Sequence, residues 1–394
     1  MNRFFLPRCL LLLWLAVSLF PVQAAAQSQK HKRAGGKPAA HKLRHHASKK
    51  PLPPAFATRP EVQAFVAEMV AQHGFERATL LQDFAHVRPL PAVQQAVRPP
   101  RDPRVRSWRE YRSRFIEPRR IEGGLRFWQQ HQAGLEAASA VTGVPPEIIV
   151  AIIGIESIYG SHMGNFGTLA ALATLAFDYP SINPATDAAR AALFRRELEE
   201  LLLLAREEER SPLDFRGSYA GALGWPQFLP GSIRKYAVDG DRDGRIDLVG
   251  SPEDALASVA NFLAQHGWRR GEPVVLRAQV RADVVIPPLL AEGILPKRLP
   301  AEWAALGVIP VPASAVEASA VVPALPAALI DLVTPDRDTE YWLGFQNFYV
   351  ITRYNRSSFY AMAVFDLAQA LREVRAARRA EEPKVDSAAP ATMP

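Results

Sequence analysis

Apolar residues recur every three or four positions in several segments, which is the spacing of one face of an α-helix. Residues 184–209, 252–266 and 357–380 show this amphipathic pattern over long stretches, and residues 60–73 show it near the start. In residues 60–73 the apolar stripe consists of Val62, Phe65, Val66, Met69 and Val70. We therefore predict a helix in each of the four segments.

Another helix is predicted after Pro145 and Pro146, because proline is tolerated in the first helical turn, where amide donors have no partner. The residues from Glu147 to Glu156 are apolar on all sides of such a helix. A helix without a polar face belongs inside a protein. We expect this one to be buried.

The pattern changes near Glu272, where β-branched residues and prolines replace the helical spacing. Short strands are predicted at residues 273–276, 284–287, 329–333 and 341–352. Together they indicate a small β-containing module over residues 273–350.

The chain has 394 residues and 48% hydrophobic content, enough for a sizeable core and more than one domain. Arg3 and Arg8 precede an apolar run that ends at Phe20, and small residues follow at 24–26. This is typical of a secretory signal peptide over residues 1–26, and the run is too short to cross a bilayer. We expect a soluble, exported mature chain.

Cys9 is the single cysteine and lies within the predicted signal peptide. Its position, early in the apolar run, does not suit attachment of a lipid. The mature chain would therefore contain no cysteine, which excludes internal disulfides, thiolate catalysis and cysteine-ligated metals.

The net charge of +7 is not spread along the chain. The first 50 residues hold ten Lys and Arg side chains and no acidic one, so residues 51–394 carry a net charge of −3. The basicity belongs to a tail at residues 27–54, which we expect to be a solvated linker or to contact an anionic envelope surface. Nucleic acid is not an expected partner.

Glu156 is the most informative carboxylate, since it shares a helix face with Ile149 and Ile152. Burial raises the pKa of a carboxyl group, which suits an acid that donates a proton near neutral pH. The pattern alone also fits a structural glutamate that is paired with an arginine or bound by backbone amides.

Five blocks favour the catalytic interpretation. They read GVPPEIIV at 143–150, IESIYG at 155–160, ALATLAFDYP at 171–180, GSYAGALGWPQFLP at 217–230 and GFQNFYVITRYN at 344–355. In this order, over most of residues 55–375, they resemble the lytic transglycosylase B family, the membrane-bound murein hydrolases and their soluble relatives.

The resemblance implies cleavage of the bond between N-acetylmuramic acid and N-acetylglucosamine in peptidoglycan without water. The family's glutamic acid, here Glu156, protonates the glycosidic oxygen and then takes the proton of the C6 hydroxyl, which closes a 1,6-anhydro ring. Glycosidases usually need two carboxylates, but an intramolecular nucleophile needs no second one. We interpret Asp178 and Asp187, the nearest other candidates, as structural or surface groups.

Further residues are carried over from the family's motifs as expected substrate-binding positions. Ser218 and Gln227 match the sugar cleft near the acid, and Tyr354, Asn355 and Tyr360 match the groove beside the scissile bond. Tyr111, in an aromatic stripe with Trp108 and Phe115, suits the family's cleft tyrosine. Each could instead be ordinary packing.

The sequence departs from the family after Pro180. Well-known members carry an arginine pair there, whereas this chain has Ser181 and Ile182 followed by an apparent insertion. Recognition of the peptide stem or the lactyl group is therefore open. Arg190, Arg195 and Arg196 are the nearest residues that could compensate.

A separate motif predicts a cation site. Asp239, Asp241 and Asp243 stand at positions 1, 3 and 5 of an EF-hand-like loop, Gly244 is at position 6, and Arg245 can offer its carbonyl at position 7. Gly250 replaces the usual glutamate at position 12. In the family a later carboxylate closes the site, here Asp254 or less favourably Glu253. We expect structural Ca²⁺, with a solvent-facing acidic turn as the alternative.

The expected fold class is α+β, mainly α, with a lysozyme-like catalytic core, an N-terminal helical region and a small β module. We expect a periplasmic monomer whose partner is peptidoglycan glycan strands. A hydrolytic muramidase and a non-catalytic peptidoglycan-binding scaffold are the competing hypotheses. The predicted organisation is a signal peptide at 1–26, a basic linker at 27–54, a helical region at 55–137, the core at 138–272, the β module at 273–350, a returning helix at 351–380 and a tail at 381–394.

Overall fold

The computed structural model describes residues 53–99, 106–311 and 322–381. The signal peptide predicted at 1–26, nearly all of the basic linker and the tail after Glu381 lie outside the described residues. Those that are described form two compact units, one comprising residues 53–89 and the other beginning at Leu90. The finer domain boundaries given above remain predictions.

The smaller unit has one short 3-10 helix and two α-helices, η1 Phe56–Thr58, α1 Pro60–His73 and α2 Arg77–His86. Helix α1 has the predicted bounds, and four of the five predicted stripe residues are buried. The rings of Phe65 and Phe84 meet edge to face with centroids 6.1 Å apart, so this unit has an aromatic core of its own.

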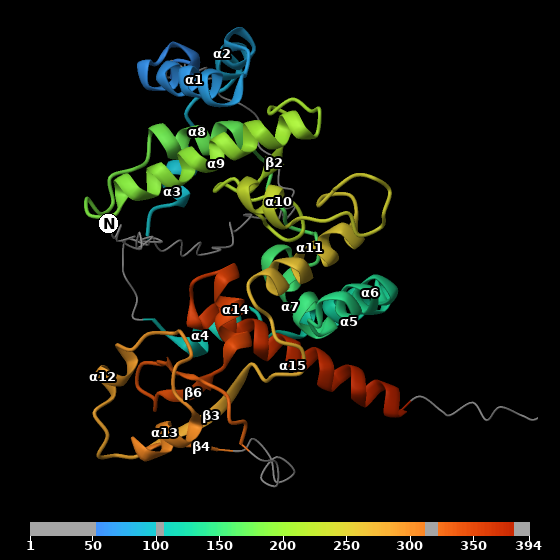
Figure 1. Ribbon diagram of the computed structural model, residues 1–394, viewed down its shortest axis with the longest axis vertical. Coiled ribbons are helices and arrows are strands. Elements are labelled where there is room, and N and C mark those ends of the chain that lie inside the picture. The colour runs from blue at the N-terminus through green and yellow to red at the C-terminus, as the bar shows by residue number, and fades with distance from the viewer. Residues whose placement is uncertain (1–52, 100–105, 312–321, 382–394) are drawn as a thin grey trace, which may run out of the picture. The chain divides into compact units, whose positions relative to one another are not determined.

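The larger unit is mainly helical (Figure 1). Its helices are α3 Pro91–Ala96, α4 Trp108–Ser113, α5 Pro118–Gln130, α6 Gln132–Thr142, α7 Pro146–Ser157, α8 Thr168–Phe177, α9 Asp187–Glu207, α10 Pro230–Tyr236, α11 Pro252–Gln265, α12 Ile286–Leu290, α13 Pro300–Ala305, α14 Gln346–Tyr354 and α15 Ser358–Glu381. The predicted mainly-α, α+β class is confirmed.

Helix α7 lies at the centre of this unit. It begins at Pro146, as predicted, and nine of its twelve residues are buried. Helices α5, α6, α11 and α15 all pack against it. An apolar helix surrounded in this way is a rigid support for any polar group that it carries.

Two small antiparallel sheets accompany the helices. Strands β1 Phe166–Gly167 and β2 Arg216–Gly217 pair with each other. Strands β3 Val275–Val280, β4 Val308–Pro310, β5 Ala328–Leu332 and β6 Glu340–Gly344 form a four-stranded sheet in the order β4-β3-β6-β5. One core cluster combines sheet residues such as Leu329 and Leu343 with Trp303 of α13.

Two predicted strands are wrong in part or whole. Residues 284–287 form no strand, because α12 begins at Ile286 with Pro287 and Pro288 in its first turn. A proline cannot donate to a strand ladder, whereas the first helical turn tolerates it.

The segment predicted as one strand at 341–352 divides instead. Strand β6 ends at Gly344 and helix α14 begins at Gln346. The buried positions Phe348, Ile351 and Thr352 then follow helical spacing rather than alternation.

Within the described residues, no single helix combines the length and the apolar composition that crossing a membrane requires. Among the helices that the structure describes, α6 and α7 taken together reach that length and composition, and their axes are bent by 115°.

Candidate active site

Glu156 lies in the last turn of α7, one residue before the helix ends. The chain leaves the helix through Ile158 and Tyr159, both in the left-handed region with φ of 50° and 55°. Ile152, Ile153 and Ile155 beside the acid are buried, while Glu156 keeps partial exposure. The carboxyl group therefore sits in an apolar wall and can still be reached by a ligand.

The strained turn after Glu156 is held by polar contacts. Ser157 Oγ donates to the Trp225 carbonyl at 2.8 Å and accepts from the Gly160 amide at 3.1 Å. Tyr159 Oη donates to the Arg120 carbonyl at 2.9 Å. These contacts fix the acid's backbone relative to the loop that contains Trp225.

Ser157 and Tyr159 had no separate role in the sequence interpretation, although both lie in the IESIYG block. A polar residue that interrupts an apolar helix at its last turn is the signal that could have identified Ser157. Gly154 belongs to the same arrangement, since a Cβ there would come within 2.6 Å of Tyr159 Oη. The block thus encodes the turn as well as the acid.

The pKa of Glu156 is raised to about 7 by burial, and a hydrogen bond from Tyr360 opposes part of this rise. Tyr360 Oη donates to Glu156 Oε1 at 2.6 Å. A carboxyl group with such a pKa is protonated in a large fraction of molecules at neutral pH, so it can act as a general acid. The predicted desolvation of Glu156 has a physical basis in this structure.

Two more tyrosines are electrostatically coupled to the acid. The rings of Tyr354 and Tyr360 stack with centroids 6.4 Å apart. Burial and the charge of Glu156 raise the pKa of Tyr111 and Tyr354 well above the usual tyrosine range. Both phenols therefore stay neutral near neutral pH, and Tyr354 Oη donates a hydrogen bond to the Pro226 carbonyl.

The loop containing Ser218 and Gln227 reaches the site through its backbone. Ser218 Oγ accepts the amides of Ala220 and Ala222 at 3.3 and 3.0 Å. Gln227, with φ of 51°, donates to the Met163 and Gly224 carbonyls at 3.2 and 2.8 Å. Both side chains therefore shape the loop, whatever they contact in a complex.

This loop then presents carbonyl groups to the acid's surroundings. The Trp225 carbonyl binds Ser157, and the Pro226 carbonyl accepts from Tyr354 Oη at 2.6 Å. The predicted residues Tyr111, Tyr354 and Tyr360 thus gather around Glu156. Ser218 and Gln227 instead hold the loop whose carbonyl groups bind Ser157 and Tyr354. Asn355 Oδ1 is buried without a partner among the described residues.

No second carboxylate contributes to the shift of the Glu156 pKa among the described residues. Asp187 instead accepts the amides of Ile182 at 2.8 Å and Asn183 at 2.9 Å, ahead of α9. Glu156 is therefore the carboxyl group that the tyrosines surround.

A separate acidic cluster combines the loop between α10 and α11 with the first turn of α11. Asp239, Asp241 and Asp254 each offer a carboxylate oxygen, and these oxygens lie within 4.8 Å of one another. Asp254 is 1% exposed and accepts the Gly240 and Asp247 amides at 2.7 and 2.6 Å. Three hard oxygen donors at this separation, one of them a buried charge, fit a calcium ion.

The other residues predicted for this loop have different places. Asp243 is not part of the group of three, and its Oδ1 accepts the Arg245 amide at 2.8 Å. Glu253, the less favoured closing ligand, lies 3.5 Å from His131 Nδ1. Asp254 is thus the later carboxylate that joins the cluster.

The chain is similar to known proteins in sequence. The family model described as the transglycosylase SLT domain matches residues 57–369. The chain is 40% identical over 327 residues to membrane-bound lytic murein transglycosylase B of Escherichia coli strain K12, covering 80% of this chain and 84% of that protein.

Solved structures give the same result. The soluble lytic transglycosylase SltB1 from Pseudomonas aeruginosa matches with a TM-score of 0.71 and 42% identity, over 80% of this chain and 100% of that one. Escherichia coli Slt35 in complex with calcium matches with a TM-score of 0.70 and 39% identity, over 82% and 96%. Pseudomonas aeruginosa SltB3 in complex with NAG-NAM-pentapeptide matches with a TM-score of 0.65 and 30% identity, over 79% of each chain.

Proposed function

Since the chain belongs to the lytic murein transglycosylase B family, we propose that it cleaves the MurNAc-GlcNAc β-1,4 bond of peptidoglycan and leaves a 1,6-anhydro-MurNAc end. Membership identifies an enzyme that breaks a glycosidic bond without hydrolysis, with the predicted lysozyme-like fold. The observation that carries the finer proposal is the desolvated carboxyl group of Glu156, whose pKa is raised to about 7.

The first step uses Glu156 as an acid. Its proton passes to the glycosidic oxygen, the bond between that oxygen and C1 of the muramyl sugar breaks, and the departing sugar leaves with a hydroxyl group. A carboxyl group that is still protonated near neutral pH supplies this proton without help from a cofactor.

The second step uses the same group as a base. The C6 oxygen of the muramyl sugar bonds to C1 and gives its proton to the Glu156 carboxylate, which restores the acid. Because the nucleophile already belongs to the reacting sugar, proximity replaces the second carboxylate of ordinary glycosidases. The hydrogen bond from Tyr360 supports the carboxylate formed between the two steps.

Analysis of the products by mass spectrometry tests this proposal directly. Digestion of purified sacculi should release muropeptides that end in 1,6-anhydro-MurNAc. Reducing muramyl ends would instead identify a hydrolytic muramidase, and the absence of any release would favour a non-catalytic scaffold. Each of the latter results would contradict the proposed reaction.

Tyr360→Phe should move the pH dependence of the reaction. The lost hydroxyl stabilises the carboxylate form, so its removal should raise the pKa of Glu156 further, by roughly one unit. The alkaline limb of kcat/KM should therefore shift to higher pH, while kcat falls because the second step needs the carboxylate. A pH-rate profile between about pH 5 and 9 measures this shift.

The matched control for Tyr360→Phe is Tyr236→Phe. It also removes a partly buried hydroxyl, but that hydroxyl contacts His266 instead of Glu156. Its profile should coincide with that of the unmodified protein. An unchanged alkaline limb in Tyr360→Phe would show that this tyrosine does not tune the acid.

We further propose that Asp239, Asp241 and Asp254 hold a structural calcium ion, with the Arg245 carbonyl as an additional donor. The oxygens of the three carboxylates are close enough to share one ion, and a similar protein has been solved with calcium. Bound there, the divalent ion would offset two of the three negative charges and would stiffen the loop between α10 and α11. Neither step of the reaction uses it. The function of Asp243 in this loop would then be to hold the turn.

The substrate also suggests a location. Peptidoglycan lies outside the cytoplasmic membrane, and the predicted signal peptide would export the chain to it. We propose that the mature enzyme acts in the periplasm. Contact of the basic linker with an anionic envelope surface and a monomeric state remain predictions.

A further inference from the structure

A concave site on the larger unit is lined in part by Arg353 and Arg356, which lie on either side of Tyr354 and Asn355 in the sequence. It is a pocket of about 420 Å³ between strand β5, the chain after α12, and the turn that joins α14 to α15. Leu290, Leu329 and Ile330 form its apolar wall. A volume in this range suits part of a flexible ligand, such as several residues of a peptide.

The charge of this pocket is predominantly positive. Arg106, Arg353 and Arg356 line it, and Asp331 is the acidic residue among its lining side chains. No carboxylate among the described residues lies within ion-pair distance of Arg106 or Arg353. An anion that entered the pocket would find guanidinium groups that the protein has not neutralised.

Aromatic rings position two of these guanidinium groups. The Arg106 guanidinium lies 4.5 Å from the ring centre of Phe359, and that of Arg353 lies 4.3 Å from the ring centre of Tyr349. Arg353 Nε is buried and has no hydrogen-bond partner in the part of the chain that the structure describes. Arg353 Nη2 donates to Thr352 Oγ1 at 3.1 Å. Stacking of this kind holds the planar group and leaves its other N–H groups to bind another molecule.

The positive charges also act on each other. Burial, together with the nearby charge of Arg353, lowers the pKa of Arg356. A bound anion would reverse this effect, because it stabilises both charges at once.

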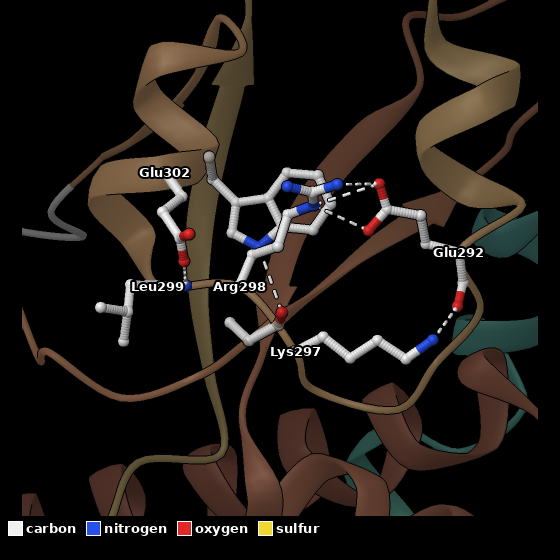
Figure 2. A network of polar contacts seen from close by, with 7 residues as sticks. Glu292, Lys297, Arg298, Leu299 and Glu302 are labelled. Atoms are coloured by element: carbon white, nitrogen blue, oxygen red, sulfur yellow. Dashed lines mark hydrogen bonds and ion pairs between the residues drawn. The ribbon is translucent and has the colours of Figure 1, made fainter.

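The chain after α12, which forms part of the pocket wall, is held by the polar contacts that Figure 2 shows. Glu292 and Arg298 form a paired contact, with Arg298 Nε 2.8 Å from Oε2 and Arg298 Nη2 2.7 Å from Oε1 of Glu292. Lys297 Nζ donates to the Glu292 carbonyl at 3.1 Å. These contacts join the two ends of the segment 292–298. Gly293 and Ile294, which lie in this segment, are thereby held in place at the pocket wall.

The pocket adjoins the acid through one turn of chain. Arg353 and Arg356 flank Tyr354 and Asn355, and the ring of Tyr354 stacks on Tyr360, which binds Glu156. On the other side, Phe359 beneath Arg106 contacts the ring of Tyr111, with centroids 5.6 Å apart. A substituent of a sugar bound at Glu156 could therefore reach the arginines.

We propose that this pocket binds a carboxylate of the peptide that is attached to the muramyl sugar of the substrate. This assignment rests on the proposed function. Arginine forks match the two oxygens of a carboxylate, and the apolar wall suits the peptide's carbon skeleton. The NAG-NAM-pentapeptide found in complex with SltB3 is a molecule of this class.

Binding of defined fragments to the full chain carrying Glu156→Gln tests this assignment. NAG-NAM-pentapeptide should bind at least about tenfold more tightly than NAG-NAM without peptide, as expected for a charge-assisted contact. The double variant Arg106→Gln/Arg356→Gln should reduce that advantage to within about threefold. With Arg106→Gln kept and Arg356→Lys in place of Arg356→Gln, part of the advantage should return. Isothermal titration calorimetry measures each affinity.

Arg126→Gln is the matched control, because it removes an exposed arginine from α5, which contributes no residue to the pocket. The peptide advantage should persist in this variant. An advantage that is absent from the parent, or unchanged in the double variant, would overturn the assignment. So would displacement of the peptide by an equal concentration of inorganic phosphate, since the pocket would then not be selective for a carboxylate.

This experiment separates the two proposals. The Glu156→Gln background measures binding without turnover, so the result does not depend on the reaction that the unmodified enzyme performs. If sacculi yielded no anhydro ends, the proposed function would fail while the pocket could still be tested.

Discussion

Replacing Glu156 with glutamine is expected to lower the turnover number for glycan cleavage by about a thousandfold or more. One positioned general acid or base contributes roughly 10²- to 10⁴-fold, and here both roles fall on the same side chain. Glutamine keeps the shape of the residue but can neither donate the proton nor accept it back. Quantifying anhydro-muropeptides released from sacculi measures the loss.

Glu147→Gln is the control for this substitution, since it neutralises another carboxylate of α7, in the helix's first turn. Its activity should remain close to that of the unmodified enzyme. Retention of more than about a tenth of the activity in Glu156→Gln would show that this residue is not the acid.

Glu156→Gln should not destabilise the fold. The pH dependence of the free energy of unfolding provides a check. Burial raises the pKa of Glu156 from 4.5 to about 7, so between these values the folded state binds the proton more strongly than the unfolded chain does. The free energy of unfolding of the unmodified protein therefore falls as the pH rises through this window. Glutamine does not titrate, so the free energy of unfolding of Glu156→Gln does not fall in this way. The free energy of unfolding of the variant minus that of the unmodified protein should therefore rise by about 2 kcal/mol between pH 5 and pH 8.

Calcium should produce the second large effect, on thermal stability. An ion that binds only the folded state at a hundred times its Kd adds about 2.7 kcal/mol, which corresponds to a Tm higher by roughly 5 °C or more. Removal of the ion with EDTA should reverse the increase. Differential scanning calorimetry with and without calcium measures it, and magnesium at equal concentration should have a much smaller effect, because it prefers to keep its water.

Variants of the cluster make this test specific. Asp241→Asn and Asp254→Asn should each abolish most of the calcium-dependent increase in Tm, since each removes one of the three carboxylates. Asp254→Asn also affects the amides of Gly240 and Asp247, so the informative quantity is the increase and not the Tm itself. Glu253→Gln, next in sequence but directed to His131, should retain the full increase. A Tm that does not respond to calcium in the unmodified protein would contradict the proposed site.

The helical core could be predicted well from the sequence because its signals are local. Helix α1 has its predicted bounds, α11 ends one residue earlier than predicted, and α15 begins and ends one residue later than predicted. The strand predictions were weaker, because β-branched and aromatic residues are compatible with both types of structure. At 341–352 only the change of spacing after Gly344 separates strand from helix, and at 284–287 the two prolines decide for a helix.

The candidate site could be predicted in its identity but not in its contacts. The resemblance pointed to Glu156 and the tyrosines, whereas no local pattern shows that Tyr360 binds a residue 204 positions earlier. The same holds for Ser157, whose partner Trp225 lies 68 positions away. The arginine pocket escaped prediction for a similar reason, since its wall comes from four separate stretches of the chain.

The long separation between Glu156 and Tyr360 also bears on the biosynthesis of the enzyme. The ribosome completes α7 well before it reaches α15, so Glu156 is synthesised before the tyrosine that binds it. Until then the acid lacks both the tyrosine that binds it and the helix that shields it from water. We therefore expect a chain that ends before α15 to lack the glycan-cleaving activity proposed for Glu156.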